Sequence, residues 1–285
     1  MAPKLTVYSF VGSQWAGVVH LALAEKGFSK DEYTVKEVDL VKAENFDPKY
    51  LEVNTNGTIP SLVSSSLDKP LVESTDILRY LDSLGTTTLA QTNPQLQQRT
   101  QDLINLVHSG NVDTNVILLN ARDPEEMERK AASPWKDFVQ NRQTKLDEEH
   151  EAGPETPFYR FKRQENAALY RFYSTSVGRH HQEFFERSHA MYRAFATGMN
   201  KLENLLVLPY AAGDSVTEAD FHVVPWLAHA MWGADTESSE IHNFGPLESL
   251  IQKSEPGFSV GPRTREWWRN IAAAESFQTV YPTLH

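Results

Sequence analysis

The stretch of sequence that decides the fold spans residues 54–84 and reads NTNGTIPSLVSSSLDKPLVESTDILRYLDSL. It opens with a cluster of turn-forming residues at 54–60, centred on Asn56-Gly57. Residues 61–63 and 70–72 are short and rich in apolar residues, and they predict the two strands of a hairpin. Residues 74–84 place apolar side chains at helical spacing, so they predict an amphipathic helix that follows the hairpin.

The preceding residues alternate between strand and helix patterns. Residues 5–10 and 33–40 predict strands, because both are rich in β-forming residues and the second alternates apolar with polar side chains. Residues 14–26 predict a helix that ends at Gly27, and residues 46–53 predict a second, short helix. The predicted order is β-α-β-α-β-β-α, which describes one small α/β domain over residues 1–85.

The following residues contain only helix patterns. Gly85-Thr86-Thr87-Thr88 and Asn93-Pro94 predict a linker, after which residues 94–285 predict an all-helical domain. Residues 121–165 are unusually charged, and Glu125/Arg129 and Glu126/Lys130 have the i,i+4 spacing of ion pairs. The pattern predicts an exposed, partly mobile helical insertion around residues 121–180. Within the insertion one helical face carries mostly large apolar side chains: Trp135, Phe138, Val139, Arg142 and Leu146.

The clearest local signature of the second half is GDSVTEADF, at residues 213–221. Thr217 can cap a helix through the amide of Asp220, and the Asp220 carboxylate can accept from the amide of Thr217. Val216 and Phe221 occupy the two positions of a hydrophobic staple. The pattern predicts the start of a helix and a role in folding, with no role in catalysis.

The composition excludes several classes of function. The 285 residues include no cysteine, which excludes disulfides, thiolate nucleophiles and cysteine metal sites. The formal charge of −11 argues against nucleic-acid binding, and the short basic run at 160–163 is interpreted as a solvated helix face. The ten histidines show no metal-binding spacing. We find no apolar run long enough to cross a membrane and no secretion signal, so we expect a cytoplasmic protein.

Taken together, these segments resemble the cytosolic glutathione transferase family. The resemblance rests on NGTIPSL at 56–62, VESTDILRYL at 72–81, HLALAEKG at 20–27, the capping box at 217–220 and WWRNI at 267–271. Their order and spacing are similar to those of fungal members, among them the type that detoxifies trichothecene toxins by opening an epoxide; the insertion at 121–180 is a departure. The resemblance implies a thioredoxin-like α/β domain followed by an all-α domain, glutathione as co-substrate, no metal and a homodimer.

The resemblance also implies a glutathione site. Glu73 and Ser74 would hold the γ-glutamyl group, with Ser74 at a helix start that favours an anion. Ile59 would offer its backbone to the cysteinyl part, next to a cis Pro60, although the sequence leaves the proline isomer open. The glycyl carboxylate has no clear partner in this sequence, and Asn45 and Lys49 are the candidates, with Lys42 as a further possibility.

Ser13 is the predicted donor to the thiolate, because it precedes Gly27 by the interval found in serine-type family members and would begin the first helix. Tyr8 is the rival, at the end of the first strand, where tyrosine-type members carry their phenol. Ser9 is a lesser candidate for the same pocket. The hydrophobic electrophile would contact Phe10, Gln14 and Trp15.

Three functions remain open at this level. The first is an enzyme that conjugates the glutathione thiolate to an electrophile. The second is a binding or regulatory module on the same fold that has lost activity. The third is glutathione-dependent peroxide reduction at the same site. Retention of Glu73-Ser74, Pro60 and Ser13 favours the first, because a module that does not bind glutathione needs none of them.

Overall fold

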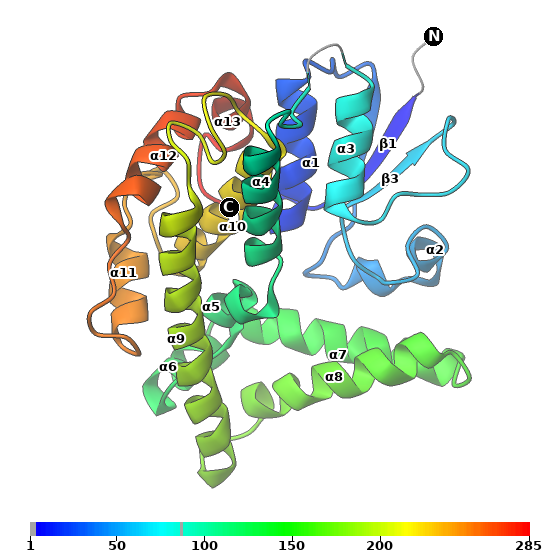
Figure 1. The fold of residues 1–285 in the computed structure, drawn as a ribbon. Helices are drawn as coiled ribbons and strands as arrows, with labels where there is room; N and C mark the ends of the chain where they lie inside the picture. The colour runs from blue at the N-terminus through cyan, green and yellow to red at the C-terminus, as the bar shows by residue number, and fades with distance from the viewer. Residues whose placement is uncertain (1–3, 86–87) are drawn as a thin grey trace.

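The computed structural model describes residues 4–85 and 88–285 of the chain (Figure 1). The expected linker at 85–88 therefore lies partly outside the described residues, as does the start of the chain at residues 1–3. Among the described residues, no helix combines the length and the apolar character that crossing a membrane requires.

The first domain is built on a three-stranded sheet with strand order β2-β1-β3. The central strand β1 (Leu5–Ser9) pairs in parallel with β2 (Tyr33–Glu37) and antiparallel with β3 (Ser61–Ser64). The predicted strand at 70–72 is reduced to a single bridge, in which Leu62 and Leu71 exchange two backbone hydrogen bonds of 2.8 and 2.9 Å. Pro70 has no N–H to donate, so it cannot extend that ladder.

Helices pack on both faces of this sheet. Helices α1 (Gln14–Glu25) and α3 (Ser74–Ser83) lie side by side on one face, while the short elements η1 (Glu44–Phe46) and α2 (Pro48–Leu51) lie on the other side (Figure 1). Helix α1 ends as predicted at Gly27, whose φ of +69° is a conformation that glycine adopts without strain. The Ile59–Pro60 peptide bond is cis, as the resemblance implied.

The second part of the chain is helical throughout its described residues, as predicted. It contains ten α-helices and two short 3₁₀ segments: α4 (Pro94–Val107), η2 (Gly110–Val112), α5 (Asn115–Leu119), α6 (Pro124–Ala131), α7 (Pro134–Ala152), α8 (Pro157–Ser174), η3 (Arg179–His181), α9 (Gln182–Leu205), α10 (Glu218–Gly233), α11 (Gly245–Gln252), α12 (Pro262–Ala272) and α13 (Glu275–Val280). Helix α10 is mostly apolar and is buried around its whole circumference, and it packs against α1 of the first domain and α4 of the second. The two parts therefore share one hydrophobic core.

The predicted capping box begins helix α10. The carboxylate of Asp220 accepts hydrogen bonds from the backbone N–H of Thr217 at 2.9 Å and from its hydroxyl at 3.0 Å. The other carboxylate oxygen accepts from the backbone N–H of Ala211 and from the indole N–H of Trp267, both at 2.8 Å. Asp220 is fully buried, so these four donors compensate for the burial of its carboxylate.

The segment predicted as an exposed insertion is a set of packed helices. Helices α7 and α8 form an antiparallel hairpin that extends beneath the first domain (Figure 1). The hairpin contacts that domain through the hydroxyl of Tyr159, which donates to the carbonyl of Phe46 at 2.9 Å, and through Lys145, which pairs with Asp47 at 2.5 Å. Its surface is charged as expected, but Val139, Leu146 and Tyr159 are buried.

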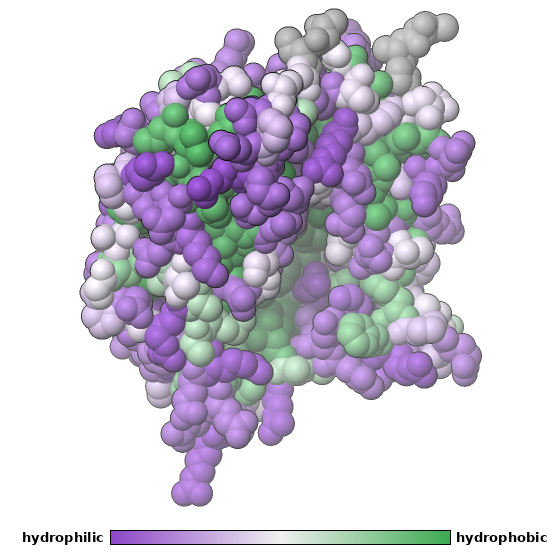
Figure 2. All heavy atoms as spheres, viewed as in Figure 1, coloured by the Kyte–Doolittle hydropathy of each residue, from purple (hydrophilic) through white to green (hydrophobic). Residues whose placement is uncertain are grey.

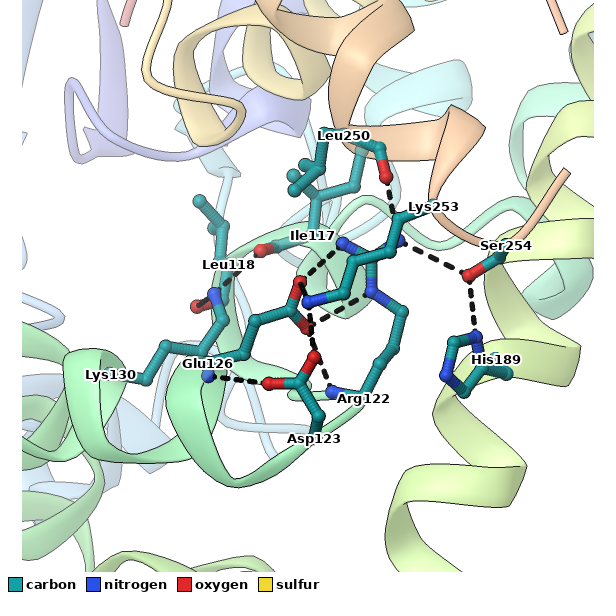
Figure 3. A network of polar contacts seen from close by, with 10 residues as sticks. All are labelled: Ile117, Leu118, Arg122, Asp123, Glu126, Lys130, His189, Leu250, Lys253 and Ser254. Carbon is teal, nitrogen blue, oxygen red and sulfur yellow. Dashed lines mark hydrogen bonds and ion pairs between the residues drawn. The ribbon is translucent and has the colours of Figure 1, made fainter. Parts of the chain in front are cut away.

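The predicted ion pair between Glu126 and Lys130 is wrong. Glu126 is buried and accepts from the guanidinium of Arg122 at 2.6 and 3.0 Å and from Lys253 at 2.9 Å (Figure 3). Lys130 instead donates to the carbonyls of Ile117 and Leu118, at the end of α5. Sequence spacing identified the charges but not their partners: Glu126 pairs with Arg122, on the preceding turn of the chain, and with the distant Lys253.

This polar network joins three helices. Arg122, just before α6, also donates to the carbonyl of Leu250 at 2.6 Å and to the hydroxyl of Ser254 at 3.2 Å. The ring of His189, on α9, is joined to the same hydroxyl at 2.9 Å (Figure 3). Burial raises the pKa of the Glu126 carboxyl, but the hydrogen bonds from Arg122 and Lys253 outweigh it and lower that pKa to about 2. The network therefore holds α6 against α9 and α11.

Candidate functional site

The turn between β1 and α1 places Ser13 at the start of a helix. The backbone N–H of Ser13 donates to the carbonyl of Phe10 at 3.0 Å, which closes the turn. Ser13 is the N-cap of α1 with an extended backbone, yet its side chain makes no capping hydrogen bond. Its half-buried hydroxyl is thus available to a ligand, next to the positive end of the α1 dipole.

A chain of hydrogen bonds fixes the next residue, Gln14. The hydroxyl of Thr114 donates to the side-chain carbonyl of Gln14 at 2.6 Å, and Nδ1 of His229 lies 2.8 Å from that same hydroxyl. Because the hydroxyl has only one proton, which goes to Gln14, Nδ1 of His229 must be the donor. Burial lowers the pKa of His229 to about 4, so the ring is neutral at pH 7.

The turn at 54–60 is held by side chains from its own vicinity. The carbonyl of Thr58 accepts from the hydroxyl of Tyr50 at 2.5 Å and from the side-chain amide of Asn54 at 2.7 Å. Gly57 has a φ of +61°, and a Cβ there would lie 2.7 Å from the ring of Phe158, on α8. The turn therefore needs glycine both for its backbone conformation and for its contact with the second part of the chain.

The start of α3 contributes the remaining wall. Glu73 is the N-cap and is exposed, and Ser74 is the buried first residue of the helix. Neither side chain makes a capping hydrogen bond to the helix. An exposed carboxylate thus stands next to a helix N-terminus, where the free N–H groups of the first turn favour a negatively charged ligand.

Two adjoining cavities lie between the first domain and the helices. The first cavity has a volume of about 510 Å³ and is lined by Trp15, Thr55, Asn56, Thr58, Ile59, Pro60, Val72, Glu73, Ser74, His108, Phe158 and Lys162. The second cavity has a volume of about 590 Å³; its lining includes Ser13, Gln14, Asn45, Phe138, Arg142 and His229. Trp15, Thr58, Ile59 and Lys162 line both. Figure 2 shows the surface hollowed between the first domain and the α7–α8 hairpin, with apolar side chains in the hollow.

Comparison with known proteins connects these cavities to a family. The glutathione S-transferase N-terminal domain matches residues 3–83. Residues 3–83 are therefore similar to the N-terminal domain of that family. The sheet, the cis proline and the start of α3 lie in the matched residues, and both cavities open along the edge of this domain.

Relatives with similar sequences occur in a plant and in a fungus. Glutathione S-transferase Z1 of Arabidopsis thaliana is 38% identical over 79 residues, which cover 28% of this chain and 34% of that protein. The chain thus matches about a third of the length of this relative. Maleylacetoacetate isomerase maiA of Aspergillus fumigatus is 23% identical over 278 residues, covering 94% of this chain and 92% of that protein.

Solved structures extend the similarity of fold to both domains. The β-etherase LigF of Sphingobium sp. strain SYK-6 superposes with a TM-score of 0.64 at 18% identity, covering 99% of each chain. Gtt2 of Saccharomyces cerevisiae superposes with a TM-score of 0.55 at 19% identity, covering 96% of this chain and 99% of that one. The chain therefore has the glutathione transferase fold, a thioredoxin-like domain followed by an all-helical one.

The structure brings most of the predicted residues together. Ile59, Pro60, Glu73 and Ser74 meet in the first cavity, and Ser13, Gln14 and Asn45 line the second. Trp15 lines both. Asn45 is largely committed to the fold, because its amide donates to the carbonyl of Gly57 at 2.7 Å, while its buried side-chain oxygen has no partner among the described residues.

Three predicted residues lie outside these two cavities. Lys49 is exposed on α2 and lines neither cavity. Phe10 is half-buried in the turn between β1 and α1 and also lines neither cavity. Tyr8 is on the sheet face that packs on Tyr50, with ring centroids 5.7 Å apart, and its hydroxyl accepts from Lys36 at 3.4 Å. The alternation of side chains along β1 turns Tyr8 away from Ser9 and from the start of α1. The lesser candidate Ser9 is buried, and its hydroxyl bonds to His20 at 2.8 Å.

The helical domain supplies residues that sequence reasoning missed. Lys162, interpreted as part of a solvated helix face, lines both cavities and pairs with Glu165 at 2.8 Å. The ring of His108 stacks on Trp15 at a centroid distance of 3.9 Å, and a hydrogen bond of 2.9 Å joins it to buried His222. Lys162 follows Phe158, which the structure places in the first cavity, by one helical turn, but nothing in the sequence distinguished this lysine from its charged neighbours.

No group of three or more histidine, aspartate or glutamate side chains suited to holding a metal occurs in residues 4–85 and 88–285. The candidate site consists of hydroxyl, amide, carboxylate and ammonium groups around two partly apolar cavities.

Proposed function

We propose that the chain is a glutathione transferase, which conjugates the thiolate of glutathione to an electrophilic small molecule. The observation that carries the proposal is the junction of the two cavities. One contains the cis-proline edge and the start of α3, the other contains Ser13, and they share Trp15 and Lys162. Two substrates can therefore meet beside a hydroxyl at a helix N-terminus.

Glutathione has one ammonium and two carboxylates to be matched. In this proposal the γ-glutamyl carboxylate binds at the N-terminus of α3 beside Ser74, and the ammonium pairs with Glu73. The backbone of Ile59 pairs with the cysteinyl unit as an added strand would. Lys162 takes the place assigned to Lys49 as partner of the glycyl carboxylate, because it lines the first cavity and Lys49 does not.

Ser13 acts on the sulfur. Its hydroxyl donates a hydrogen bond to the thiolate, which favours the ionised form, and the α1 dipole acts in the same direction. The thiol proton leaves to solvent. The sulfur then forms a bond to the electrophilic carbon, while the bond to the leaving group breaks and the leaving group departs with its electron pair. Ser13 itself forms no covalent bond.

The test combines binding with turnover. The purified chain is applied to immobilised glutathione and eluted with free glutathione. Conjugation is then assayed with 1-chloro-2,4-dinitrobenzene, an isothiocyanate and an epoxide-bearing trichothecene, and peroxide reduction with cumene hydroperoxide. Ser13→Ala and Tyr8→Phe are compared with Ser83→Ala, a control at an exposed serine whose hydroxyl donates to the carbonyl of Tyr80.

We expect retention, conjugation, and a loss of about 10- to 100-fold in kcat/KM for Ser13→Ala, the usual effect of deleting a hydrogen bond to a charged group. The pH profile of the variant should move to higher pH, because the bound thiol would then ionise less readily. Tyr8→Phe and Ser83→Ala should leave both kcat/KM and the pH profile unchanged. Retention without turnover of any substrate would instead favour a non-catalytic binding module, and turnover of the peroxide alone would favour a peroxidase.

The finer expectations belong to the same test. The named relatives come from a plant, two fungi and a bacterium, so they do not single out the fungal type. Epoxide opening in trichothecene toxins stays a hypothesis that the toxin assay decides. A homodimer and a cytoplasmic location are also proposals, and sedimentation of the purified chain tests the first.

A further inference from the structure

The α7–α8 hairpin forms the wall of the second cavity opposite the first domain. It contributes apolar side chains to the cavity, among them Phe138, Val139, Leu146 and Leu169. One charged side chain of α7 stands among them. Arg142 belongs to the helical face that the sequence predicted as apolar, and the hairpin turns that face into the cavity.

The guanidinium of Arg142 has no ion pair and no hydrogen bond within the described residues, 4–85 and 88–285. Its central carbon lies 4.4 Å from the ring centroid of Phe46 and 5.2 Å from that of Phe138. The acid that acts on it electrostatically is Glu165, whose carboxylate is already paired with Lys162 at 2.8 Å. Two aromatic faces thus orient the cation, and its five N–H donors remain unused.

The contacts of Arg122 provide a comparison for those of Arg142. Arg122 too lies against an aromatic ring, with its central carbon 3.9 Å from the ring centroid of Tyr192. Its donors, however, are occupied by Glu126, by the carbonyl of Leu250 and by Ser254 (Figure 3). A buried guanidinium is costly unless it is paired, and Arg122 is buried and paired. Arg142 is half-buried, so its guanidinium can stay without a protein partner and remain accessible from the cavity.

Arg142 remains a cation at neutral pH. Burial lowers the pKa of its guanidinium to about 10, against the opposing effect of Glu165. The cavity is also lined by Asp113, Lys162 and Glu165, but Lys162 and Glu165 pair with each other, whereas Arg142 is unpaired among the described residues. An unpaired cation attracts a group with the opposite charge, and the planar fork of a guanidinium fits a carboxylate with two parallel hydrogen bonds.

We propose that Arg142 binds a carboxylate of the electrophile, so that this enzyme prefers electrophiles with an apolar body and an anionic end. The reactive carbon would then lie toward Ser13 and the carboxylate toward Arg142, both of which line the second cavity. The proposal rests on the proposed transferase function. It assigns the choice of substrate to the α7–α8 hairpin, which is the part of the chain that departs from the family pattern.

The test uses two substrates of nearly the same shape, the anionic 4-chloro-3-nitrobenzoate and the neutral 4-chloro-3-nitrobenzamide, and compares each variant with the wild type on the same substrate. In both, the glutathione sulfur forms a bond to the ring carbon that bears chlorine, and chloride leaves with the bonding electron pair. Each kcat/KM is measured for the wild type, Arg142→Gln, Arg142→Lys and Arg160→Gln. Arg160 is the matched control, because it is an exposed arginine of α8 that lines neither cavity.

We expect Arg142→Gln to lower kcat/KM for the benzoate by about 10- to 100-fold and for the benzamide by less than about 3-fold. Arg142→Lys should fall between the wild type and Arg142→Gln, because it keeps the charge and loses the fork. Arg160→Gln should leave both substrates unaffected. An equal change of both substrates in Arg142→Gln, or no change in either, would overturn the proposal.

A binding experiment separates this proposal from the proposed function. The protein is saturated with S-methylglutathione and titrated calorimetrically with 3-nitrobenzoate and 3-nitrobenzamide. In one outcome the wild type turns over neither chloronitro substrate but binds 3-nitrobenzoate, and Arg142→Gln abolishes this binding. The transferase function is then wrong and the carboxylate site is supported. If Arg142→Gln weakens binding of glutathione itself and leaves the benzoate unaffected, Arg142 serves glutathione and the proposal is wrong.

Discussion

Lowering the pH should destabilise this protein through His229, at the base of the second cavity. His229 is 4% exposed, and its pKa of about 4 in the folded chain compares with 6.5 for the free side chain. Below pH 6.5 the unfolded chain binds a proton that the folded chain does not, so the free energy of unfolding falls with falling pH until about pH 4. Each pH unit in that window costs about 1.4 kcal/mol, so His229 should remove about 2 kcal/mol between pH 6.5 and pH 5.

The assay is urea unfolding followed by circular dichroism at pH 7.5 and pH 5.0. The wild type is compared with His229→Gln, which keeps an N–H donor for Thr114 and does not titrate. The variant should be less stable at pH 7.5, because glutamine fills the site less well, but its loss of stability on going to pH 5.0 should be about 2 kcal/mol smaller than that of the wild type. Other buried histidines titrate in both proteins and cancel in this difference.

The matched control is His242→Gln, at an exposed histidine. It should show the same dependence on pH as the wild type. The reasoning is refuted if His229→Gln loses as much stability on acidification as the wild type does, because the proton uptake would then occur at other residues.

Three further predictions concern stability. Asp220→Ala should lose about 3–5 kcal/mol of unfolding free energy by calorimetry, because it leaves four buried donors without their acceptor; a loss below about 1 kcal/mol would contradict this. Arg122→Met should lose a similar amount and make α6 more sensitive to proteolysis, since Glu126 then loses the guanidinium and keeps only Lys253 and the backbone N–H of residue 122; unchanged proteolysis would show that the network does not hold α6. Gly57→Ala should lose about 1–3 kcal/mol of unfolding free energy and weaken glutathione binding measured by calorimetry, because residue 57 has a positive φ and a Cβ there would lie 2.7 Å from the ring of Phe158. Wild-type affinity for glutathione would contradict the role of this turn.

Local patterns in the sequence determined the elements of the first domain and the start of α10. Strand alternation, the turn at Asn56-Gly57 and the capping box depend on neighbours within a few residues, so the sequence shows them directly. The composition alone excluded a catalytic thiol. The helix-start position of Ser13 was likewise readable, because capping is a local property, although the freedom of its hydroxyl was not.

The partners of charged residues were decided by the tertiary structure. Glu126 and Lys130 have the spacing of a surface ion pair, yet packing brings Arg122 and Lys253 to the first and backbone carbonyls to the second. The sequence also could not show that Ser13 lines the second cavity while Tyr8 packs on Tyr50, since this depends on which sheet face the helices cover.

The second cavity exists only in the folded chain. Lys162 and Arg142 lie on helices that look like charged surface helices in the sequence, and they reach the site because the α7–α8 hairpin docks on the first domain through Tyr159 and Lys145. Helical periodicity states which side chains share a face but not what that face meets. The sequence by itself therefore determined the fold and half of the candidate site, and the docking of distant helices decided the other half.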